Sequence, residues 1–398
     1  MSQPIIPFTR VPSVKVPIVV NAAGLVGADN TLIIIGHMAA TGSTVTAGQP
    51  VGINNFGDPA AAALECATYF GAGSEAGAMV VAAIQGVLFS NLAVKLFPPI
   101  KVIPLASGAA SSTLAGTLAG LLTLPAAYIA SCFGGTDAVA LTALENYLTA
   151  ISGFDRGDNG QFGSFGFVAL DGDTSTVTPI GIGAASEKVC FPWLRDLAST
   201  KSNVISNVAA AYGAVCASLS VPYLPLSGIT VGGLIPPASS SDYHSAGDTG
   251  TASLGLSAGL SPMLITPGGR VAISRSITSL RTVSSIEDSA YYDMQDWQVL
   301  YYLRKNSYNI ASQPRYRQAK ASVAKFQALK SELLQLCKTL ESLEMLQYVD
   351  LLASQFTVER SLQNRHAGLF RVPVNVIPGF ANKGIELDAG VLFDVVAG

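Results

Sequence analysis

The sequence predicts an α/β protein, with mixed α/β and α+β character, that is divided into domains and ends in extended strands. Between residues 126 and 219, segments typical of strands alternate with segments typical of helices, which favours βαβ units and a largely parallel sheet. The chain has 398 residues, enough for two or three domains of roughly 150 residues each. Residues 221–259 are rich in Pro, Gly and Ser and form the clearest connection between domains.

Before residue 126, the pattern indicates two strands and two helices. The continuous apolar run over 32–35, followed by Gly36, is typical of a buried strand. Asp58 is the expected N-cap of a helix over 59–69 that starts with Pro59, and a second helix is expected over 75–89. A strand follows at 101–105, and the small, polar residues 106–120 favour a hairpin.

The alternating part and the C-terminal third complete the predicted elements. Strands are expected at 128–133, 165–170, 188–191, after the turn at 267–269, and at 371–377, with helices at 137–151, 202–219, 291–305 and 320–356. The last helix is the strongest, because its apolar residues recur at spacings of three and four: Phe326, Leu329, Leu333, Leu336, Leu340 and Leu343. This regularity ends at Gln347, too early for a long coiled coil, so we expect a core helix.

Both ends of the chain have the period-two alternation of strands. Pro17 restricts the N-terminal strand to a sheet edge. Terminal strands without a hairpin partner leave backbone N–H and C=O groups unpaired, and these must pair within the chain or with a neighbouring subunit. We predict an inter-subunit strand interface formed by Val14, Val16, Ile18, Val20, Ile385, Leu387, Val391, Phe393 and Val395.

The composition indicates a surface that is largely covered. Only 12% of residues are charged, 49% are hydrophobic, and the mean hydropathy is +0.42. A surface so poor in charge is typical of contact with neighbouring subunits or with lipid. The uncharged runs 76–94 and 102–136 raise the possibility of a membrane protein, but glycine, proline and polar residues interrupt them.

The charge gives no electrostatic reason to bind nucleic acid, because the net charge is −3 and the pI about 5.6. Basic residues and tyrosines do gather between Arg304 and Lys330, which makes nucleic-acid binding an alternative. Since the whole chain is acidic, we favour a charged protein–protein face, and we predict no direct nucleic-acid partner.

No catalytic, cofactor or metal site is predicted. The five cysteines form no CxxC pair and are expected to be buried thiols, and His37, His244 and His366 show no ligand spacing. The stretch 71–74, Gly-Ala-Gly-Ser, lacks the lysine of a P-loop, and 162–166 does not match GxSxG. An acidic loop region lacks EF-hand spacing: Asp155, Asp158, Asp171 and Asp173.

Several stretches together resemble a known family. They are the Val-Pro-rich strand over 11–20, the strand that ends Ile35-Gly36, and Phe-Gly-Ala-Gly-Ser at 70–74. The most specific stretch is Ile-Thr-Pro-Gly-Gly-Arg-Val-Ala-Ile-Ser-Arg-Ser-Ile-Thr at 265–278, followed by Asp296-Trp297, Tyr301-Tyr302 and Leu303-Arg304. Along nearly its whole length the chain resembles the contractile tail sheath proteins of bacteriophages, particularly the Mu-like branch.

The resemblance implies a structural, non-enzymatic subunit of the virion tail that is assembled in the host cytoplasm. It implies a homo-oligomer of stacked hexameric rings, arranged helically around a tail tube, with baseplate and tail terminator proteins as further partners. It implies that terminal arms add strands to neighbouring subunits, and that contraction drives the tube through the host envelope for genome ejection. No cofactor and no membrane insertion are expected. Our hypothesis places hinges at 24–27 and 378–379.

Four segments are expected: an N-terminal arm strand (1–20), an outer α/β domain (21–264), a C-terminal polymerisation domain (265–384) and a C-terminal arm strand (385–398). An integral membrane protein and an α/β enzyme of unknown activity are the alternatives that the sequence leaves open.

Overall fold

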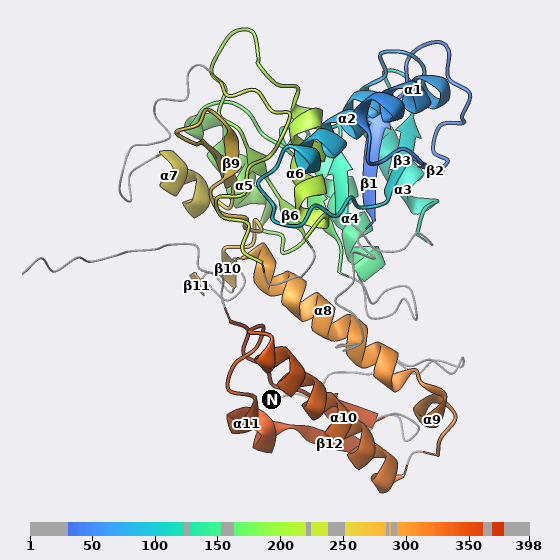
Figure 1. The fold of residues 1–398 in the computed structure, drawn as a ribbon, viewed down its shortest axis with the longest axis vertical. Helices are drawn as coiled ribbons and strands as arrows, with labels where there is room; N and C mark the ends of the chain where they lie inside the picture. Colours follow the sequence, from blue (N-terminus) through green and yellow to red (C-terminus); the bar gives the residue numbers. More distant parts are fainter. Residues whose placement is uncertain are drawn as a thin grey trace, which may run out of the picture.

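The computed structural model describes residues 31–122, 128–152, 163–219, 224–237, 251–283, 286–287, 293–320, 322–360 and 368–377. Figure 1 shows a larger upper part built on a sheet and a smaller lower part in which helices lie beside a short strand pair. The long helix α8 (Met294–Ala311) runs from the upper part into the lower part. The predicted arm strands and hinges, at 1–20, 24–27, 378–379 and 385–398, lie outside the described residues.

The upper part contains a six-stranded sheet in the order β2-β3-β1-β4-β5-β6. The strands are β1 (Leu32–His37), β2 (Val51–Gly52), β3 (Ile100–Leu105), β4 (Tyr128–Ser131), β5 (Phe165–Phe167) and β6 (Val189–Cys190). All neighbours are parallel except β2, which pairs antiparallel with β3 at the edge. The strand order reverses around β1: β3 joins it on one side and β4, next along the chain, joins it on the other. The carboxyl ends of β1 and β4 therefore meet at the point where an open α/β sheet most often binds ligands.

Helices cover both faces of this sheet. On one face, α2 (Glu75–Leu88) contacts β1, and α6 (Ile205–Ala217) contacts β1, β4 and β5. On the other face, α4 (Ala138–Ser152) contacts β5 and packs against α3 (Leu114–Ala119). The helix α1 (Pro59–Phe70) precedes α2, and its Asp58 cap accepts a hydrogen bond from the Ala60 N–H at 2.9 Å, as predicted.

The uncharged run over 76–94 is a buried core helix. α2 and α6 approach so closely that a Cβ on Gly86 would lie 2.8 Å from the Ala211 carbonyl oxygen. Both helices are rich in Ala and Gly, and α6 is buried on nearly every side, which is expected of a helix in the middle of a core. Within the part of the chain that the structure describes, no helix is both long enough and apolar enough to span a membrane.

The rest of the upper part lies beside the sheet. It comprises η1 (Ser111–Thr113), α5 (Thr174–Ala184), α7 (Thr251–Ser257), and a sheet of β7 (Pro192–Trp193), β8 (Ser261–Ile265) and β9 (Val271–Ile273) in that order. The hairpin predicted over 106–120 is wrong. That stretch is helical, because Leu114 and Leu118, four residues apart, bury their side chains together on one face of α3.

The lower part contains α9 (Pro314–Arg317), α10 (Val323–Ser342), α11 (Val349–Leu352) and η5 (Ala353–Gln355), followed by the antiparallel pair β12 (Thr357–Arg360) and β13 (Gly368–Arg371). A further pair, β10 (Thr282–Val283) and β11 (Ile286–Glu287), precedes α8. The helix predicted over 320–356 ends early, because Glu344 and Tyr348 have φ angles of 58° and 61°, which an α-helix cannot contain. The strand predicted over 371–377 is displaced: β13 ends at Arg371, and one bridge, between Leu346 and Val376, follows.

The buried apolar residues form two clusters, and α8 contributes to both. Met294 belongs to the upper cluster, whereas Val299 and Leu303 belong to the lower one. The predicted boundary at 264–265 falls within the β8–β9 pair, and residues on both sides of it, such as Met263 and Val271, belong to the upper cluster. The hydrophobic cores therefore divide along α8, and the four-segment division remains a prediction.

Candidate functional site

The nine residues of the predicted strand interface lie outside the described residues, so that interface remains a prediction. The described strand pair in the lower part is the nearest feature of strand character. β12 and β13 pair with each other in the register Thr357↔Arg371 to Arg360↔Gly368. Within the described residues this sheet has only two strands, so each has an outer edge whose backbone groups lack a strand partner. A two-stranded sheet is only marginally stable alone, and such edges readily accept further strands.

Two features hold this strand pair to the lower core. α10 packs on β12, and the Lys330 ammonium donates a hydrogen bond to the Phe356 carbonyl at 2.7 Å, directly before β12 begins. Phe356 itself is buried in the lower cluster. The strand pair is therefore fixed to the lower core at the point where β12 begins.

The chain that leads to the predicted C-terminal arm is also anchored. The Gln347 N–H donates to the Asn375 carbonyl at 2.9 Å, and the Ile377 N–H donates to the Met345 carbonyl at 3.1 Å. Val372, Val374 and Val376 pack against the lower cluster, as their predicted common face requires. We call residues 372–377 the arm root. These contacts hold the arm root to the lower core.

Three members of the basic cluster at 304–330 are buried or bonded within the chain: Arg304, Arg315 and Lys330. The Arg315 guanidinium donates to the Glu332 carboxylate at 2.7 Å, and the Tyr316 hydroxyl bonds to the same carboxylate. Lys330 bonds to Phe356, and Arg304 is buried in α8. These three side chains bind groups of the same chain or are buried, so they are less available to phosphate groups. This favours our interpretation of a structural face over nucleic-acid binding.

The stretch over 265–278, which resembles the sheath family most specifically, joins the upper core to α8. Ile265 pairs with Val271 across the β8–β9 turn, where Gly269 has a φ of 68°. The Arg275 guanidinium then binds both carboxylate oxygens of Asp293, at 2.8 and 2.6 Å, directly before α8. The motif therefore sets the direction in which α8 leaves the sheet.

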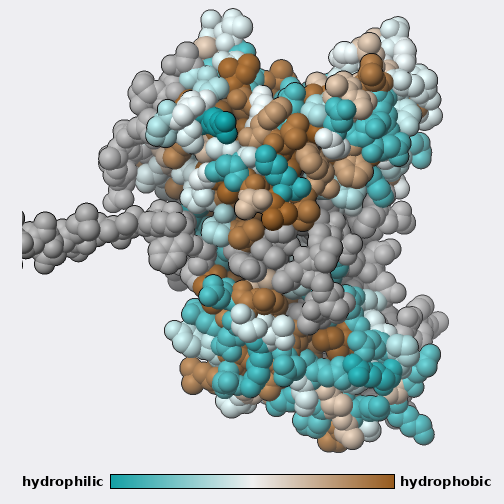
Figure 2. All heavy atoms as spheres, in the orientation of Figure 1, coloured by the Kyte–Doolittle hydropathy of each residue, from teal (hydrophilic) through white to brown (hydrophobic). Residues whose placement is uncertain are grey.

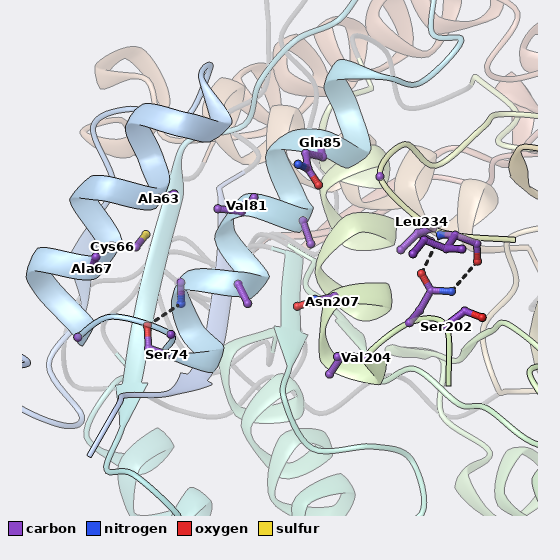
Figure 3. A pocket seen from close by; sticks show the side chains of 18 residues that line it. Ala63, Cys66, Ala67, Ser74, Val81, Gln85, Ser202, Val204, Asn207 and Leu234 are labelled. Carbon is purple, nitrogen blue, oxygen red and sulfur yellow. Dashed lines mark hydrogen bonds between the residues drawn. The ribbon is translucent and has the colours of Figure 1, made fainter. Parts of the chain in front are cut away.

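A groove lies between α1, α2 and the start of α6 (Figure 3). Its volume is about 460 Å³, and none of its lining residues is charged. Burial raises the pKa of the Cys66 thiol to about 12, so this thiol is protonated at neutral pH. Ser74 caps α2 by accepting the Gly77 N–H at 3.2 Å, and the 71–74 stretch reverses the chain between two helices, as predicted. The lining residues therefore include no base beside a nucleophile.

Hydrophobic residues gather on the face shown in Figure 2 around α2 and α6, and hydrophilic residues are more frequent around α10 and α11. Large apolar side chains are exposed near the groove, among them Phe89, Val204 and Ile235, each more than half exposed. This distribution agrees with the low charge of the sequence.

The acidic loop region is divided by the structure. Asp173 caps α5, and its carboxylate accepts a hydrogen bond at 3.0 Å from Arg195, which lowers the pKa of Asp173. Asp171 pairs with Lys201 at 3.2 Å. Asp155 and Asp158 lie outside the described residues. All five cysteines are buried free thiols, as predicted.

One group of side chains was not predicted from the sequence: His37, Glu75 and Cys132 lie together at the carboxyl ends of β1 and β4. These residues are far apart in the sequence, so no spacing motif could reveal them. The available signal was their position, because His37 ends one predicted strand, Cys132 lies near the end of the next, and Glu75 begins a predicted helix.

Solved structures with the same fold include sheath and baseplate components. A chain of the anti-feeding prophage baseplate matches with a TM-score of 0.61 and 12% identity, over 97% of this chain and 99% of that chain. A sheath tail protein from Desulfitobacterium hafniense matches with a TM-score of 0.56 and 11% identity, over 94% and 100%. A chain of the PVC sheath complex in its contracted state, from an extracellular contractile injection system, matches with a TM-score of 0.57 and 9% identity, over 98% of each chain.

No protein-family model and no curated protein sequence matches this chain. Because the identities are 9–12%, the likeness establishes the fold: this chain has the α/β fold of the contractile tail sheath proteins. The fold class and the resemblance predicted from the sequence are thereby confirmed.

Proposed function

We propose that the chain is a structural, non-enzymatic subunit of a contractile tail sheath. The observation that carries the proposal is the likeness to sheath and baseplate chains over nearly the full length of both partners. The charge-poor composition supports the same conclusion, because neighbouring subunits would cover an apolar surface.

The subunits would polymerise by exchanging terminal strands. In this proposal, residues 1–20 and 385–398 of one subunit add strands to the outer edges of β12 and β13 in its neighbours. Main-chain hydrogen bonds of this kind give affinity, and alternating side chains give register. Repetition of such heterologous contacts yields rings and helices, here stacked hexameric rings around a tail tube.

Contraction would then be a rearrangement of subunits whose strand links persist. The extended lattice would be metastable and would store the energy, so no nucleotide is required. Residues 24–27 and 378–379 would act as hinges beside the arms, and the anchored arm root supports a hinge at its far end. The contracting sheath would drive the tube through the host envelope for genome ejection.

The remaining partners and the location follow from the same proposal. The sheath would contact the tail tube, the baseplate and the tail terminator in the virion tail, and would assemble in the host cytoplasm. The four segments 1–20, 21–264, 265–384 and 385–398 would serve as arm, outer domain, polymerisation domain and arm. Because α8 contributes to both cores, the outer and polymerisation domains would move as connected bodies.

The proposal is tested by negative-stain electron microscopy of the purified full-length chain. We expect tubes without detergent. Deletion of residues 1–20, or of residues 385–398, is expected to give a folded monomer that forms no tubes. Deletion of residues 1–10 alone keeps the predicted strand over 14–20 and is the matched control, which should still form tubes.

Two results would contradict the proposal. Normal tubes from either long deletion would refute strand exchange, and a requirement for detergent would favour a membrane protein. Circular dichroism of each deletion variant distinguishes a folded monomer from an unfolded chain.

A further inference from the structure

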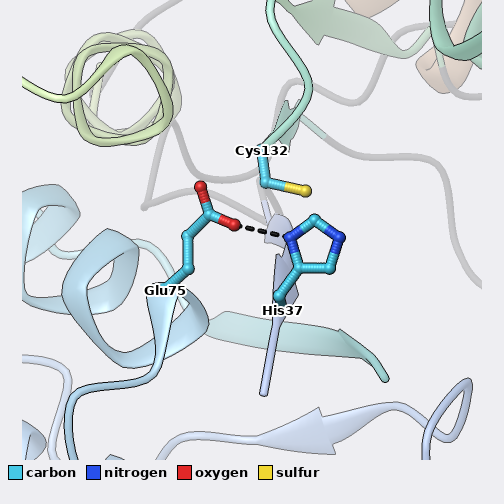
Figure 4. A group of neighbouring side chains, drawn as sticks. All are labelled: His37, Glu75 and Cys132. Carbon is cyan, nitrogen blue, oxygen red and sulfur yellow. Dashed lines mark hydrogen bonds and ion pairs between the residues drawn. The ribbon is translucent and has the colours of Figure 1, made fainter. Parts of the chain in front are cut away.

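Three side chains that ligate metals converge at the switch point of the central sheet. His37 is the last residue of β1, Cys132 follows β4 directly, and Glu75 is the first residue of α2. Figure 4 shows the Glu75 carboxylate directed at the imidazole and the Cys132 sulfur beside the ring. The three ligand atoms lie within 4.8 Å of one another, and all three residues come from elements whose backbone is fixed by the core.

The hydrogen bonds of His37 determine which ring nitrogen carries a lone pair. His37 Nε2 lies 3.0 Å from the Ala109 carbonyl oxygen, which only accepts, so Nε2 must carry a proton and donate it. In the neutral ring, Nδ1 then presents a lone pair. This lone pair faces the Glu75 carboxylate oxygen at 2.6 Å. Two acceptors at this distance require a cation between them, which is either a proton or a metal ion.

Neighbouring groups fix the orientation of His37 and Glu75, as the groups that surround the ligands of a metal ion usually do. Metal-bound histidines usually donate their second N–H to a carbonyl or carboxylate, as His37 does to Ala109. Phe133 packs edge-on against the imidazole, with ring centroids 5.3 Å apart. The end of β1 also lies close to the start of α2, because a Cβ on Gly36 would be 2.8 Å from the Ala76 Cα. This close approach brings Glu75 to His37.

We propose that His37 Nδ1, Glu75 and Cys132 Sγ bind a divalent cation of the Zn²⁺ class, with water in the fourth position. Nitrogen, oxygen and sulfur ligands together suit Zn²⁺, whereas Mg²⁺ and Ca²⁺ take oxygen ligands. Metal–ligand bonds of about 2.0–2.3 Å in a tetrahedron place the ligand atoms about 3.3–3.7 Å apart. On binding, the distance between His37 Nδ1 and the Glu75 oxygen, now 2.6 Å, would therefore increase, and Cys132 Sγ would move closer to both. The ion takes the place of the proton shared by His37 and Glu75, and the thiol proton leaves to solvent.

The inference concerns the upper part alone and does not depend on the sheath proposal. A bound ion would join β1, α2 and β4 at one point, which would stabilise the sheet against local opening without taking part in strand exchange. Tube formation and metal binding can therefore succeed or fail separately.

The test uses the full-length chain, stripped of metal with a chelator and titrated with Co²⁺, which substitutes for Zn²⁺ and reports its ligands. We expect one Co²⁺ per chain, with a near-ultraviolet sulfur-to-cobalt charge-transfer band, and displacement by Zn²⁺. Cys132→Ser should abolish the band and weaken binding at least about tenfold. Cys337→Ser removes another buried thiol, far away in α10, and is the control that should leave the band unchanged.

A second measurement keeps the test decisive if a variant folds poorly. Zn²⁺ should raise the Tm of the wild-type chain and of Cys337→Ser, because it binds only the folded form. It should not raise the Tm of Glu75→Gln or Cys132→Ser. The proposal is overturned if the wild-type chain takes up no Co²⁺, if its spectrum lacks the sulfur band, or if Cys132→Ser keeps both the band and the shift. The first of these results would leave His37 and Glu75 as a simple ion pair.

Discussion

Asp293 and Asp296 stand at the start of α8, and their environments differ. Asp293 receives two hydrogen bonds from the Arg275 guanidinium. Asp296 is also buried, and its Oδ1 has no hydrogen-bond partner among the described residues. Burial, together with the nearby Asp293 charge, raises the pKa of Asp296 to about 7, although Arg275 opposes the shift. The Asp293 carboxylate is thus hydrogen-bonded to a cation, whereas the Asp296 carboxylate is desolvated without a hydrogen bond to its Oδ1 from any described residue.

We predict that Asp296→Asn stabilises the chain at alkaline pH. A raised folded-state pKa means that the folded chain holds a proton that the unfolded chain releases near pH 4, so stability falls as the pH rises from about 4 to about 7. Asparagine removes this dependence. The variant should gain about 1–3 kcal/mol over wild type at pH 8 and lose this advantage at pH 4, measured by urea unfolding. Asp350→Asn, at an exposed site, is the control. A gain that does not change with pH would contradict the assignment.

At the scale of elements, small residues decide how closely α2 and α6 pack. A Cβ on Gly86 would meet the backbone and side chain of Ala211 at 2.8–3.1 Å, and backbone atoms cannot move aside cheaply. We predict that Gly86→Ala costs about 1–3 kcal/mol of unfolding free energy, because the two helices must separate. Gly116→Ala in α3 is the matched control. A Cβ there meets nothing within 4 Å, so helix propensity should make that substitution neutral or stabilising by up to about 1 kcal/mol. Equal effects of both substitutions would contradict this account.

The predictability of each element depended on whether its signal was local. The start of α1 was predicted correctly because Asp58 and Pro59 are a local capping signal. The end of α10 was not predicted correctly, because Glu344 and Tyr348 adopt left-handed conformations that the sequence usually marks with Gly or Asn. α5 was missed altogether, since Pro179 and its glycines disfavour a helix, and contact of Gly181 with Ala258 and Leu260 stabilises it instead.

The same distinction applies to the candidate sites. The His37–Glu75–Cys132 group could not be predicted, because it exists only once β1 and β4 pair in parallel and α2 returns to the end of β1. The arm strands were predicted from alternation alone and stay a prediction, because they lie outside the described residues. The strand pair that the proposal gives them as partners could not be predicted from local sequence, because β12, β13 and α10 come together only in the fold.

At the scale of the whole molecule, the lower part combines two roles that a sheath subunit would need. It holds the open strand pair through α10 and Lys330, and it holds the arm root through Met345 and Gln347. The upper part has its own core and its own candidate metal group. Damage to the arm root should therefore affect assembly while the upper part remains folded.

We predict that Val376→Asp impairs tube formation more than it impairs folding. Val376 is half-buried against the lower core and forms the bridge with Leu346, so a charge at this contact would weaken the attachment of the arm root. Tubes should be fewer or absent by negative-stain microscopy, while the near-ultraviolet signal of Trp193, which is fully buried in the upper core, is retained. Asn375→Asp is the matched control, because this neighbouring side chain is exposed, its carbonyl still accepts the Gln347 N–H, and its Oδ1 remains an acceptor. Tubes of normal number from Val376→Asp would show that the root does not position the arm. Loss of tubes from Asn375→Asp as well would show that added charge, and not loss of anchoring, is responsible.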